Sequence, residues 1–329
     1  MSELRFNPVS RDWVIISTER AKRPSHFIKP AAERTPLPGR KDDCPFCPGN
    51  ETAGEEIARI GDAGSWKVRI VRNKFPALCC AGSPERMING IYNTMAGYGE
   101  HEVVIEHPRH DLTIALMTDD EVELIVRTYR DRYRELAKMK GVESITIFKN
   151  HGSAAGASIE HAHSQIIATP IVPPLLRNRV ETAAHFYDFA GKCLFCQVLD
   201  QEVSEGKRVV HESDSFVTFM PYASASPFAM SIFPVEHKPC FGDITDGELR
   251  DLACHLRVVL AKLYHGLGNP DYNLTIRSVP VKEAGVEYYH WFMSLIPRIS
   301  KAAGFELGSG IFINTALPEE SAEFLRNAS

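Results

Sequence analysis

The segment from residue 150 to residue 165 reads Asn150-His-Gly-Ser-Ala-Ala-Gly-Ala-Ser-Ile-Glu-His161-Ala-His163-Ser-Gln165. Side chains two residues apart in a strand point to the same side, so His161, His163 and Gln165 share one face if this end of the segment is a regular strand. The small residues before them let a phosphate group approach the backbone amides closely. The segment therefore predicts a loop and a strand that present imidazole and amide groups to a phosphate.

The pattern around this segment occurs twice along the chain. Each copy has a Cys-x-x-Cys pair and two later histidines: Cys44, Cys47, His110 and His161 in the first, and Cys193, Cys196, His237 and His290 in the second. The offset between the copies is 149 residues for both cysteines, 127 for the first histidine and 129 for the second. Two such patterns in the same order indicate a duplicated structural unit.

Each copy also contains the start signal of a helix. Thr118-Asp-Asp-Glu121 and Thr245-Asp-Gly-Glu248 are capping boxes at the same offset of 127 residues, and an apolar helical face follows each of them. Gly141 and Gly268 are placed to end these helices, because glycine tolerates positive φ. We therefore expect one long helix in each copy.

Short apolar or alternating segments predict the strands of both copies. They lie near residues 13–16, 67–71, 101–106, 144–148, 161–167, 228–233, 273–277 and 291–296. The sequence thus predicts an α+β fold made of two units, residues 1–175 and 176–329. Each unit is expected to be mostly antiparallel sheet with one long helix.

The repeated cysteines and histidines are candidate zinc ligands. Zinc in structural sites takes four thiolate or imidazole ligands in a tetrahedron, and four protein ligands leave no open position for catalysis. We therefore expect two structural zinc ions, at Cys44, Cys47, His110 and His161 and at Cys193, Cys196, His237 and His290. Buried cysteines without a metal are the alternative at each site, His107 is an alternative to His110, and iron is an alternative at the second site.

The composition narrows the class of protein. The chain has 329 residues, 44% apolar and 24% charged, with a net charge of −5. No basic surface for nucleic acid is expected from this balance. The first residues lack a signal-peptide pattern and no apolar run reaches the length of a membrane span. These features favour a soluble cytoplasmic protein, and in that reducing compartment paired cysteines are metal ligands more often than disulfides.

His163 is the candidate nucleophile. It has no counterpart in the second copy, where the equivalent residue is Phe292. A neutral imidazole is a competent nucleophile toward phosphorus. A metal at His161 would anchor the strand and so aim His163. The first copy is therefore expected to be catalytic and the second non-catalytic.

These motifs resemble the galactose-1-phosphate uridylyltransferase family, the transferase branch of the histidine-triad superfamily. The resemblance rests on the His-x-His-x-Gln string after its small-residue loop, on Asn7-Pro-Val-Ser-Arg-Asp-Trp13 and on Arg20-Ala-Lys-Arg-Pro24. It covers nearly the whole chain. The doubled Cys2His2 pattern and Gly304-Phe-Glu-Leu-Gly-Ser-Gly310 are most similar to the ADP-glucose phosphorylase-like members. The resemblance implies two histidine-triad-like units and a homodimer.

The resemblance also implies a reaction in carbohydrate (galactose) metabolism. In it, His163 attacks a nucleotide sugar, hexose 1-phosphate leaves, and the nucleotidyl-histidine passes its group to a second phosphate compound in a ping-pong sequence. Gln165 is implied as a hydrogen-bond donor to the phosphoryl oxygens. The residues carried over as substrate contacts are Ala21, Lys22, Arg23, Pro24, Asn73, Asn150, Gly152, Ser153, Ser158 and Gln165.

Two departures from the family pattern leave the substrates open. Ala162 stands where uridylyltransferases have proline between the histidines, and Cys193 and Cys196 stand in for the Glu and His ligands of their second metal site. The leading hypothesis is a nucleotidylyltransferase of the UDP-glucose–hexose-1-phosphate type. An ADP-glucose phosphorylase that uses inorganic phosphate is the alternative within the class. A zinc-dependent nucleic-acid-binding module is the alternative from another class, although its ligands usually lie much closer in sequence than Cys47 and His110.

Overall fold

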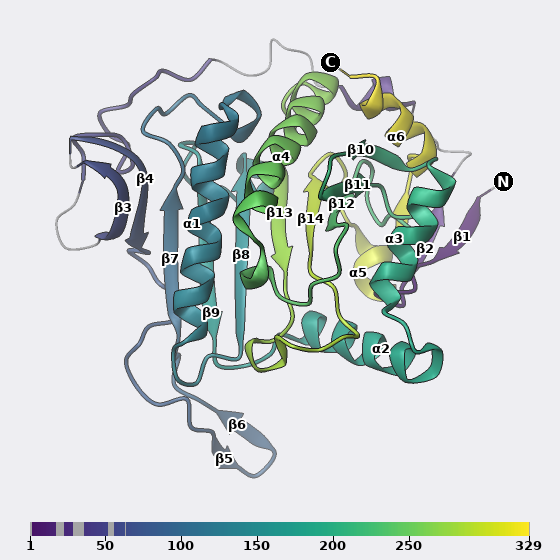
Figure 1. Ribbon diagram of the computed structural model, residues 1–329, viewed down its shortest axis with the longest axis horizontal. Helices are drawn as coiled ribbons and strands as arrows, with labels where there is room; N and C mark the ends of the chain where they lie inside the picture. Colours follow the sequence, from purple (N-terminus) through teal and green to yellow (C-terminus); the bar gives the residue numbers. More distant parts are fainter. Residues whose placement is uncertain (1, 18–22, 29–35, 52–55, 63, 329) are drawn as a thin grey trace.

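The computed structural model describes residues 2–17, 23–28, 36–51, 56–62 and 64–328. Its centre is an antiparallel sheet of ten strands in the order β10-β11-β12-β14-β13-β8-β9-β7-β4-β3 (Figure 1). The strands of its first half are β3 (Glu56–Asp62), β4 (Ser65–Arg72), β7 (Glu100–Ile105), β8 (Ser144–His151) and β9 (His163–Thr169). Those of its second half are β10 (Val209–Glu212), β11 (Phe216–Phe219), β12 (Met230–Pro234), β13 (Tyr272–Arg277) and β14 (Phe292–Pro297).

The order of strands shows the duplication directly. From the centre of the sheet outward, the first half runs β8, β9, β7, β4, β3 and the second runs β13, β14, β12, β11, β10. The two halves meet where β8 pairs with β13, with Tyr272 opposite His151 and Ile276 opposite Ile147. The predicted α+β fold with duplicated, mostly antiparallel units is confirmed. The division at residue 175 stays a prediction.

Two long helices cover one face of the sheet. α1 (Asp119–Ala137) and α4 (Asp246–Leu267) lie side by side in front of the central strands (Figure 1). Both predicted capping boxes form, at Thr118 and at Thr245. Gly268 ends α4 with positive φ as predicted, whereas α1 ends at Ala137 with Lys138 as its cap. The prediction for Gly141 is therefore wrong: it takes its positive φ in the turn that follows the helix.

The two faces of the sheet differ in character. On the helix side, Ile147, Ile166 and Leu274 join the main apolar core with residues of α1 and α4. Asn150, Gln165 and Arg277 alternate with such core positions and are half-buried. Successive side chains of a strand point to opposite faces, so these polar residues belong to the face that α1 and α4 leave uncovered.

The remaining elements lie outside the main sheet. They are α2 (Pro174–Ala190), α3 (Leu194–Glu205), α5 (Gly304–Ser309), α6 (Pro318–Arg326), the hairpin β5 (Met87–Asn89) and β6 (Tyr92–Thr94), and the small sheet of β1 (Glu3–Phe6), β2 (Trp13–Ile16) and β15 (Phe312–Asn314). All but the β5–β6 hairpin, which extends from the first half of the main sheet, lie beside its second half (Figure 1). The β5–β6 hairpin projects away from the body of the protein (Figure 1). Across the described residues, no helix is both long and apolar enough to cross a membrane.

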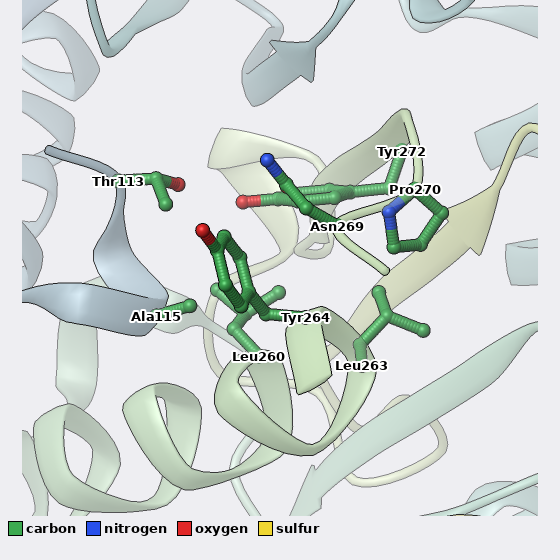
Figure 2. Close-up of a pocket in the computed structure, with 8 residues that line it drawn as sticks. All are labelled: Thr113, Ala115, Leu260, Leu263, Tyr264, Asn269, Pro270 and Tyr272. Carbon is green, nitrogen blue, oxygen red and sulfur yellow. The ribbon is translucent and has the colours of Figure 1, made fainter. Parts of the chain in front are cut away.

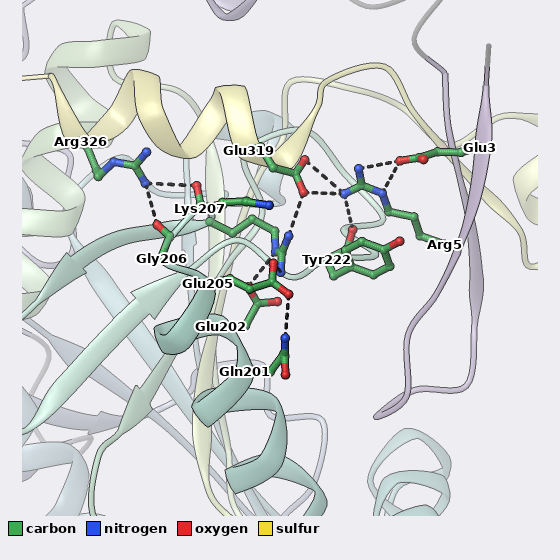
Figure 3. Close-up of polar contacts among 11 residues, drawn as sticks. Glu3, Arg5, Gln201, Glu202, Glu205, Gly206, Lys207, Tyr222, Glu319 and Arg326 are labelled. Atoms are coloured by element: carbon green, nitrogen blue, oxygen red, sulfur yellow. Dashed lines mark hydrogen bonds and ion pairs between the residues drawn. The ribbon is translucent and has the colours of Figure 1, made fainter.

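A buried charge network joins the first strand to the end of the chain (Figure 3). Glu319, at the start of α6, accepts hydrogen bonds from Arg5 of β1 and from Arg208, each at 2.9 Å. Arg208 also donates to Glu202 of α3 at 2.7 Å. Because the two guanidinium groups are almost fully buried and share one carboxylate, the network fixes β1 and α6 to the second half of the sheet.

Candidate active site

His163 is the first residue of β9 and is almost fully buried. Its Nδ1–H donates to the carbonyl of His161 at 2.8 Å, which places the lone pair on Nε2. Burial lowers the pKa of His163 below its usual value, so the ring is neutral near pH 7. In the described part of the chain Nε2 has no hydrogen-bond partner. The arrangement is that of an imidazole held ready to attack through Nε2.

Gln165 lies two residues further along β9, and its amide is oriented by two neighbours. His101 accepts the Ala77 N–H at its Nδ1, so its Nε2 carries the proton and donates to Gln165 Oε1 at 2.7 Å. The Asn73 amide donates to the same oxygen at 3.4 Å. With Oε1 engaged, the NH2 group of Gln165 remains to donate to a phosphoryl oxygen.

The loop that follows β8 is fixed by residues of the second half of the sheet. Asp271 accepts the Ala154 N–H at 2.6 Å, and Asn273 donates to Asn150 Oδ1 at 2.7 Å and to the Ala155 carbonyl at 2.9 Å. Gly152 has φ of +83°, and a Cβ there would lie 2.3 Å from the Asp271 carboxylate. Only glycine fits this position. Because Asn273 binds Asn150 Oδ1, the Asn150 NH2 group is left to face a ligand.

A buried ion pair supports the strand that carries His163. The Lys149 ammonium donates to Glu106 at 2.7 Å and to the His163 carbonyl at 3.3 Å. Burial alone would raise the pKa of Glu106, but Lys149 and hydrogen bonds from Ser164 and Tyr129 lower it below its usual value. The pair therefore remains charged and ties three strands to α1.

The other predicted substrate contacts are less constrained. Ser153 and Ser158 lie in the loop between β8 and β9 with exposed side chains. Arg23 is exposed, and Pro24 begins a short 3-10 helix. Ala21 and Lys22 lie outside the described residues.

The first predicted metal site brings four ligands together. Cys44, Cys47, His110 and His161 are buried, with their ligand atoms within 4.8 Å of one another. Cys47 Sγ lies 3.5 Å from Nδ1 of both histidines, close to the separation of about 3.5 Å that a tetrahedral zinc imposes on sulfur and nitrogen ligands. His161 donates from Nε2 to the His107 carbonyl at 2.6 Å, which leaves Nδ1 free for a metal. His107 contributes only its carbonyl, so the geometry favours His110 over the alternative.

The second predicted metal site is built at the start of α3. Cys193, Cys196 and His237 have ligand atoms within 4.8 Å of one another, and His290 Nδ1 lies 3.5 Å from Cys196 Sγ. The hydrogen bond from Cys196 lowers the pKa of Cys193 to about 5, and the same contact raises the pKa of Cys196. One sulfur is therefore a thiolate at neutral pH, the form that binds a metal.

Phe46 connects the first candidate metal site to His163, the candidate nucleophile. Its ring packs edge-on against His163, with centroids 5.2 Å apart, and against His161 at 6.1 Å. Phe46 lies between the two cysteine ligands in sequence. A metal that orders this turn therefore also fixes one wall beside the nucleophile.

Two cavities differ in what they can hold. One of about 300 Å³ is lined by Asn73, His101, Arg72, Glu100, Leu78, Pro76, Cys79 and Cys80, and it adjoins the pair that orients Gln165. Its size is at the lower end of small-molecule sites. The other cavity lies at the end of α4 and has a volume of about 10 Å³, which is room for one water at most. Tyr264, Tyr272 and Leu260, which are distant from His163 in the sequence, are among the residues that line it (Figure 2).

Sequence reasoning missed four residues of this site: His101, Lys149, Asp271 and Asn273. The alternation around His101 was visible, and its antiparallel pairing with β9 would have placed it near Gln165. Asp271 and Asn273 come from the second copy. No local pattern ties them to the loop at residue 152, because β8 and β13 are far apart in the chain.

Comparison with known proteins identifies the family. The model of the galactose-1-phosphate uridyl transferase N-terminal domain matches residues 1–173. ADP-glucose phosphorylase of Arabidopsis thaliana is 35% identical over 99% of this chain and 93% of its own length. Galactose-1-phosphate uridylyltransferase of Thermotoga maritima is 29% identical over 99% and 98%. This chain belongs to the galactose-1-phosphate uridyl transferase family, as its motifs predicted.

Solved structures agree with this assignment. The crystal structure of the Arabidopsis thaliana ADP-glucose phosphorylase with bound ADP-glucose matches with a TM-score of 0.84 at 33% identity, covering 100% of this chain and 99% of that one. A uridylyltransferase structure matches with a TM-score of 0.77 at 26% identity, covering 100% and 98%. Nothing in these comparisons favours the nucleic-acid-binding alternative.

Proposed function

We propose that this chain is a nucleotidylyltransferase that moves a nucleotidyl group from a nucleotide sugar to a second phosphate compound through a covalent bond to His163. One observation carries the proposal: the neutral His163 ring donates from Nδ1 to a backbone carbonyl and keeps its lone pair on Nε2. The family's named activities support it.

In the first step, His163 Nε2 attacks the α-phosphorus of the nucleotide sugar. The N–P bond forms as the bond to the bridging oxygen breaks, and hexose 1-phosphate leaves with the electron pair. Its phosphate is a stable anion, so the step needs no strong general acid. In the second step, a phosphate oxygen of the acceptor attacks the same phosphorus and the P–N bond returns its electrons to Nε2.

The surrounding residues act by position and by hydrogen bonding. Gln165 and Asn150 each present an NH2 group whose partner oxygen is already engaged. Such donors stabilise the charge that develops on the phosphoryl oxygens because they are already oriented when the reaction begins. Glutamine cannot transfer a proton, which suits an intermediate that must wait for its acceptor.

ADP-glucose with inorganic phosphate is the substrate pair that similarity favours. The relative named ADP-glucose phosphorylase is 35% identical, against 29% for the uridylyltransferase of Thermotoga maritima. UDP-glucose with galactose 1-phosphate is the second candidate, because the family model is that of a uridyl transferase. The two candidates share the His163 chemistry and differ in base and acceptor.

The test is detection of the covalent intermediate. Purified protein is mixed with ADP-glucose or UDP-glucose, and the peptide that contains His163 is analysed by mass spectrometry. We expect one nucleotidyl group on wild type and on the control His185→Ala, which changes an exposed histidine of α2, and none on His163→Ala. Folded wild type that gains no adduct from either sugar would contradict the proposal, as would an adduct on His163→Ala.

The acceptor is identified from the loaded enzyme. Addition of inorganic phosphate to the adenylylated protein should release ADP, whereas galactose 1-phosphate should release a nucleotide galactose. Faster release by phosphate supports the phosphorylase, and faster release by galactose 1-phosphate supports the uridylyltransferase-type reaction.

Zinc is the metal proposed at both clusters. The donor set of two thiolates and two imidazoles fits zinc, and the ligand separations fit a tetrahedron. Bound there, zinc supplies no reacting atom; it orders the chain around Phe46 and at the start of α3. Elemental analysis of protein purified without added metal tests this, and iron at the second cluster is the alternative outcome. The proposed location is the cytoplasm.

A homodimer is proposed because the family resemblance implies one. The β5–β6 hairpin carries exposed apolar side chains, with Ile88 74%, Ile91 87% and Tyr92 71% accessible. An apolar surface of this kind is typical of an interface with another chain. Sedimentation of wild type and of Ile91→Glu tests it: we expect a dimer that the variant dissociates, and a monomeric wild type would refute the proposal.

A further inference from the structure

In the second copy, the positions equivalent to His163 and Asn150 hold Phe292 and Arg277. Arg277 is the last residue of β13 and pairs with Phe292 of β14. In the first copy, Phe148 pairs with Gln165, and the same register continued by two residues places Asn150 opposite His163. Since Phe292 is the counterpart of His163, Arg277 is the counterpart of Asn150, a proposed phosphate contact.

Arg277 and two residues that interact with it electrostatically, Arg179 and Tyr289, each hold a buried hydrogen-bond donor. Within the described part of the chain, Arg179 Nε, Arg277 Nε and Tyr289 Oη are buried with no hydrogen-bond partner. Tyr289 is completely buried. Arg179 has one weak contact, from Nη1 to the Leu175 carbonyl at 3.4 Å. Buried donors are normally satisfied, so such a group needs an explanation.

The two arginines also lack a counter-charge. Burial, followed by repulsion from Arg179, lowers the pKa of Arg277 to about 10. The Arg277 guanidinium is therefore still charged at neutral pH, and it lies close enough to Arg179 for the two groups to repel each other. No ion pair between either arginine and a carboxylate occurs among the described residues. Two neighbouring like charges without a carboxylate partner repel each other unless an anion lies between them.

Arg179 and Arg277 are partly accessible to solvent, whereas Tyr289 is not. The two arginines are only half-buried, although their Nε atoms are not accessible. α2 runs beneath the ends of the central strands (Figure 1), and Tyr187 of α2 donates to Glu287 at 2.5 Å, in the segment before β14. Arg179 is therefore held against the loop that carries Tyr289.

We propose that Arg179, Arg277 and Tyr289 form a second anion-binding site, in the non-catalytic half of the chain, for a phosphate-type oxyanion. Guanidinium groups bind tetrahedral oxyanions through parallel N–H donors, and the buried tyrosine hydroxyl adds a third donor. Phe292 and the absence of a histidine there exclude nucleotidyl transfer, so the site binds without reacting. The inference goes beyond the proposed function and does not depend on it.

The test is calorimetric titration of the purified protein with inorganic phosphate. Arg277→Met and Arg179→Met should each bind phosphate at this site about tenfold or more weakly than wild type, since each variant lacks one charged donor. Arg177→Met removes the same charge from an exposed position of the same helix and should bind like wild type. Binding by Arg277→Met that equals wild type would overturn the proposal.

Thermal unfolding in phosphate-free, low-salt buffer separates this role from a structural one. An unpaired buried charge destabilises the free protein, so Arg277→Met should have a Tm at or above that of wild type in the absence of phosphate. Its Tm should rise less than that of wild type when phosphate is added, because only the His163 site then binds it. A lower Tm without phosphate, together with an unchanged rise on adding it, would show a structural arginine and refute the site.

Titrations with glucose 1-phosphate and AMP distinguish the sources of the oxyanion. A second site for free phosphate should take inorganic phosphate alone, whereas one for a phosphate ester should take these ligands as well. The His163 site binds its ligands in both proteins, so the second site is the part of the response that Arg277→Met removes. Because the readout is the difference between wild type and Arg277→Met, it is independent of whether His163 forms an adduct.

Discussion

Substitution of Lys149 by methionine should destabilise the protein strongly, because it isolates a buried carboxylate. The side chains of Lys149 and Glu106 are 2% and 0% exposed, and their charged atoms are 2.7 Å apart. Removing one partner of such a pair costs about 3–5 kcal/mol. At roughly 2.1 cal/mol/K of unfolding entropy per residue over 329 residues, that cost lowers Tm by about 4–7 °C.

The double variant Lys149→Met/Glu106→Gln tests the reason for the loss. It removes both charges and keeps an oxygen that can accept from Tyr129, so it should recover more than half of the lost stability. Lys138→Met is the matched control: its partner Glu135 and the lysine itself are 56% and 70% exposed, and the loss should be within about 0.5 kcal/mol.

The assay is thermal unfolding of the four proteins, supported by urea titration. A loss below about 1 kcal/mol for Lys149→Met would refute the reasoning, since it would mean that the Glu106 carboxylate is not left isolated. A double variant as unstable as the single one would also refute it, because the loss would then come from packing of the lysine stem.

Three further predictions follow from other parts of the structure. Asn273→Ala should lower kcat/KM for the nucleotide sugar by about tenfold with little change in Tm, because it frees the amide of Asn150; an unchanged kcat/KM would show that this contact does not position the loop. Cys193→Ser should reduce bound zinc from two ions per chain to one and lower Tm, as elemental analysis and calorimetry can establish, and a variant that keeps both ions and its stability would exclude the cysteine as a ligand. Burial lowers the pKa of His255 to about 3 in the folded protein, whereas the unfolded chain binds a proton at this residue below about pH 6.5. The free energy of unfolding therefore decreases as the pH falls from about 6.5 toward 3. Between pH 6.5 and 4.5 the free energy of unfolding should fall by about 2 kcal/mol less in His255→Gln than in wild type. The exposed His265→Gln should behave like wild type, and parallel pH profiles for all three proteins would contradict the prediction.

Periodicity and capping predicted the elements that are locally encoded. The two capping boxes give α1 and α4 their first turns from Thr118 and Thr245 alone, and the strands around them follow from alternation. α2 and α3 were not predicted. α2 begins at Pro174, directly after Pro173, and has a mostly exposed surface. It therefore carries little of the apolar periodicity on which helix prediction depends.

The candidate site was predictable only where one segment contained its residues. His163 and Gln165 stand in a single motif, and the repeat located the two clusters of candidate metal ligands. His161 precedes β9 rather than lying within it, because its ring turns toward Cys44 and Cys47. Lys149 and Glu106 were not predicted as a pair. In the sequence, each is a single charged residue at a strand, and such a residue is normally expected to face solvent.

The first copy depends on the second for the shape of its loop after β8. The loop after β8 consists of small residues whose side chains cannot fix its shape, and its anchors, Asp271 and Asn273, belong to the second copy. β8 itself would be an unpaired edge without β13. The first copy therefore needs the second to orient Asn150 and to pair with β8, although the second copy carries Phe292 where the first has His163. The second copy, without a candidate nucleophile of its own, thus contributes to the site through the geometry that it imposes on the first.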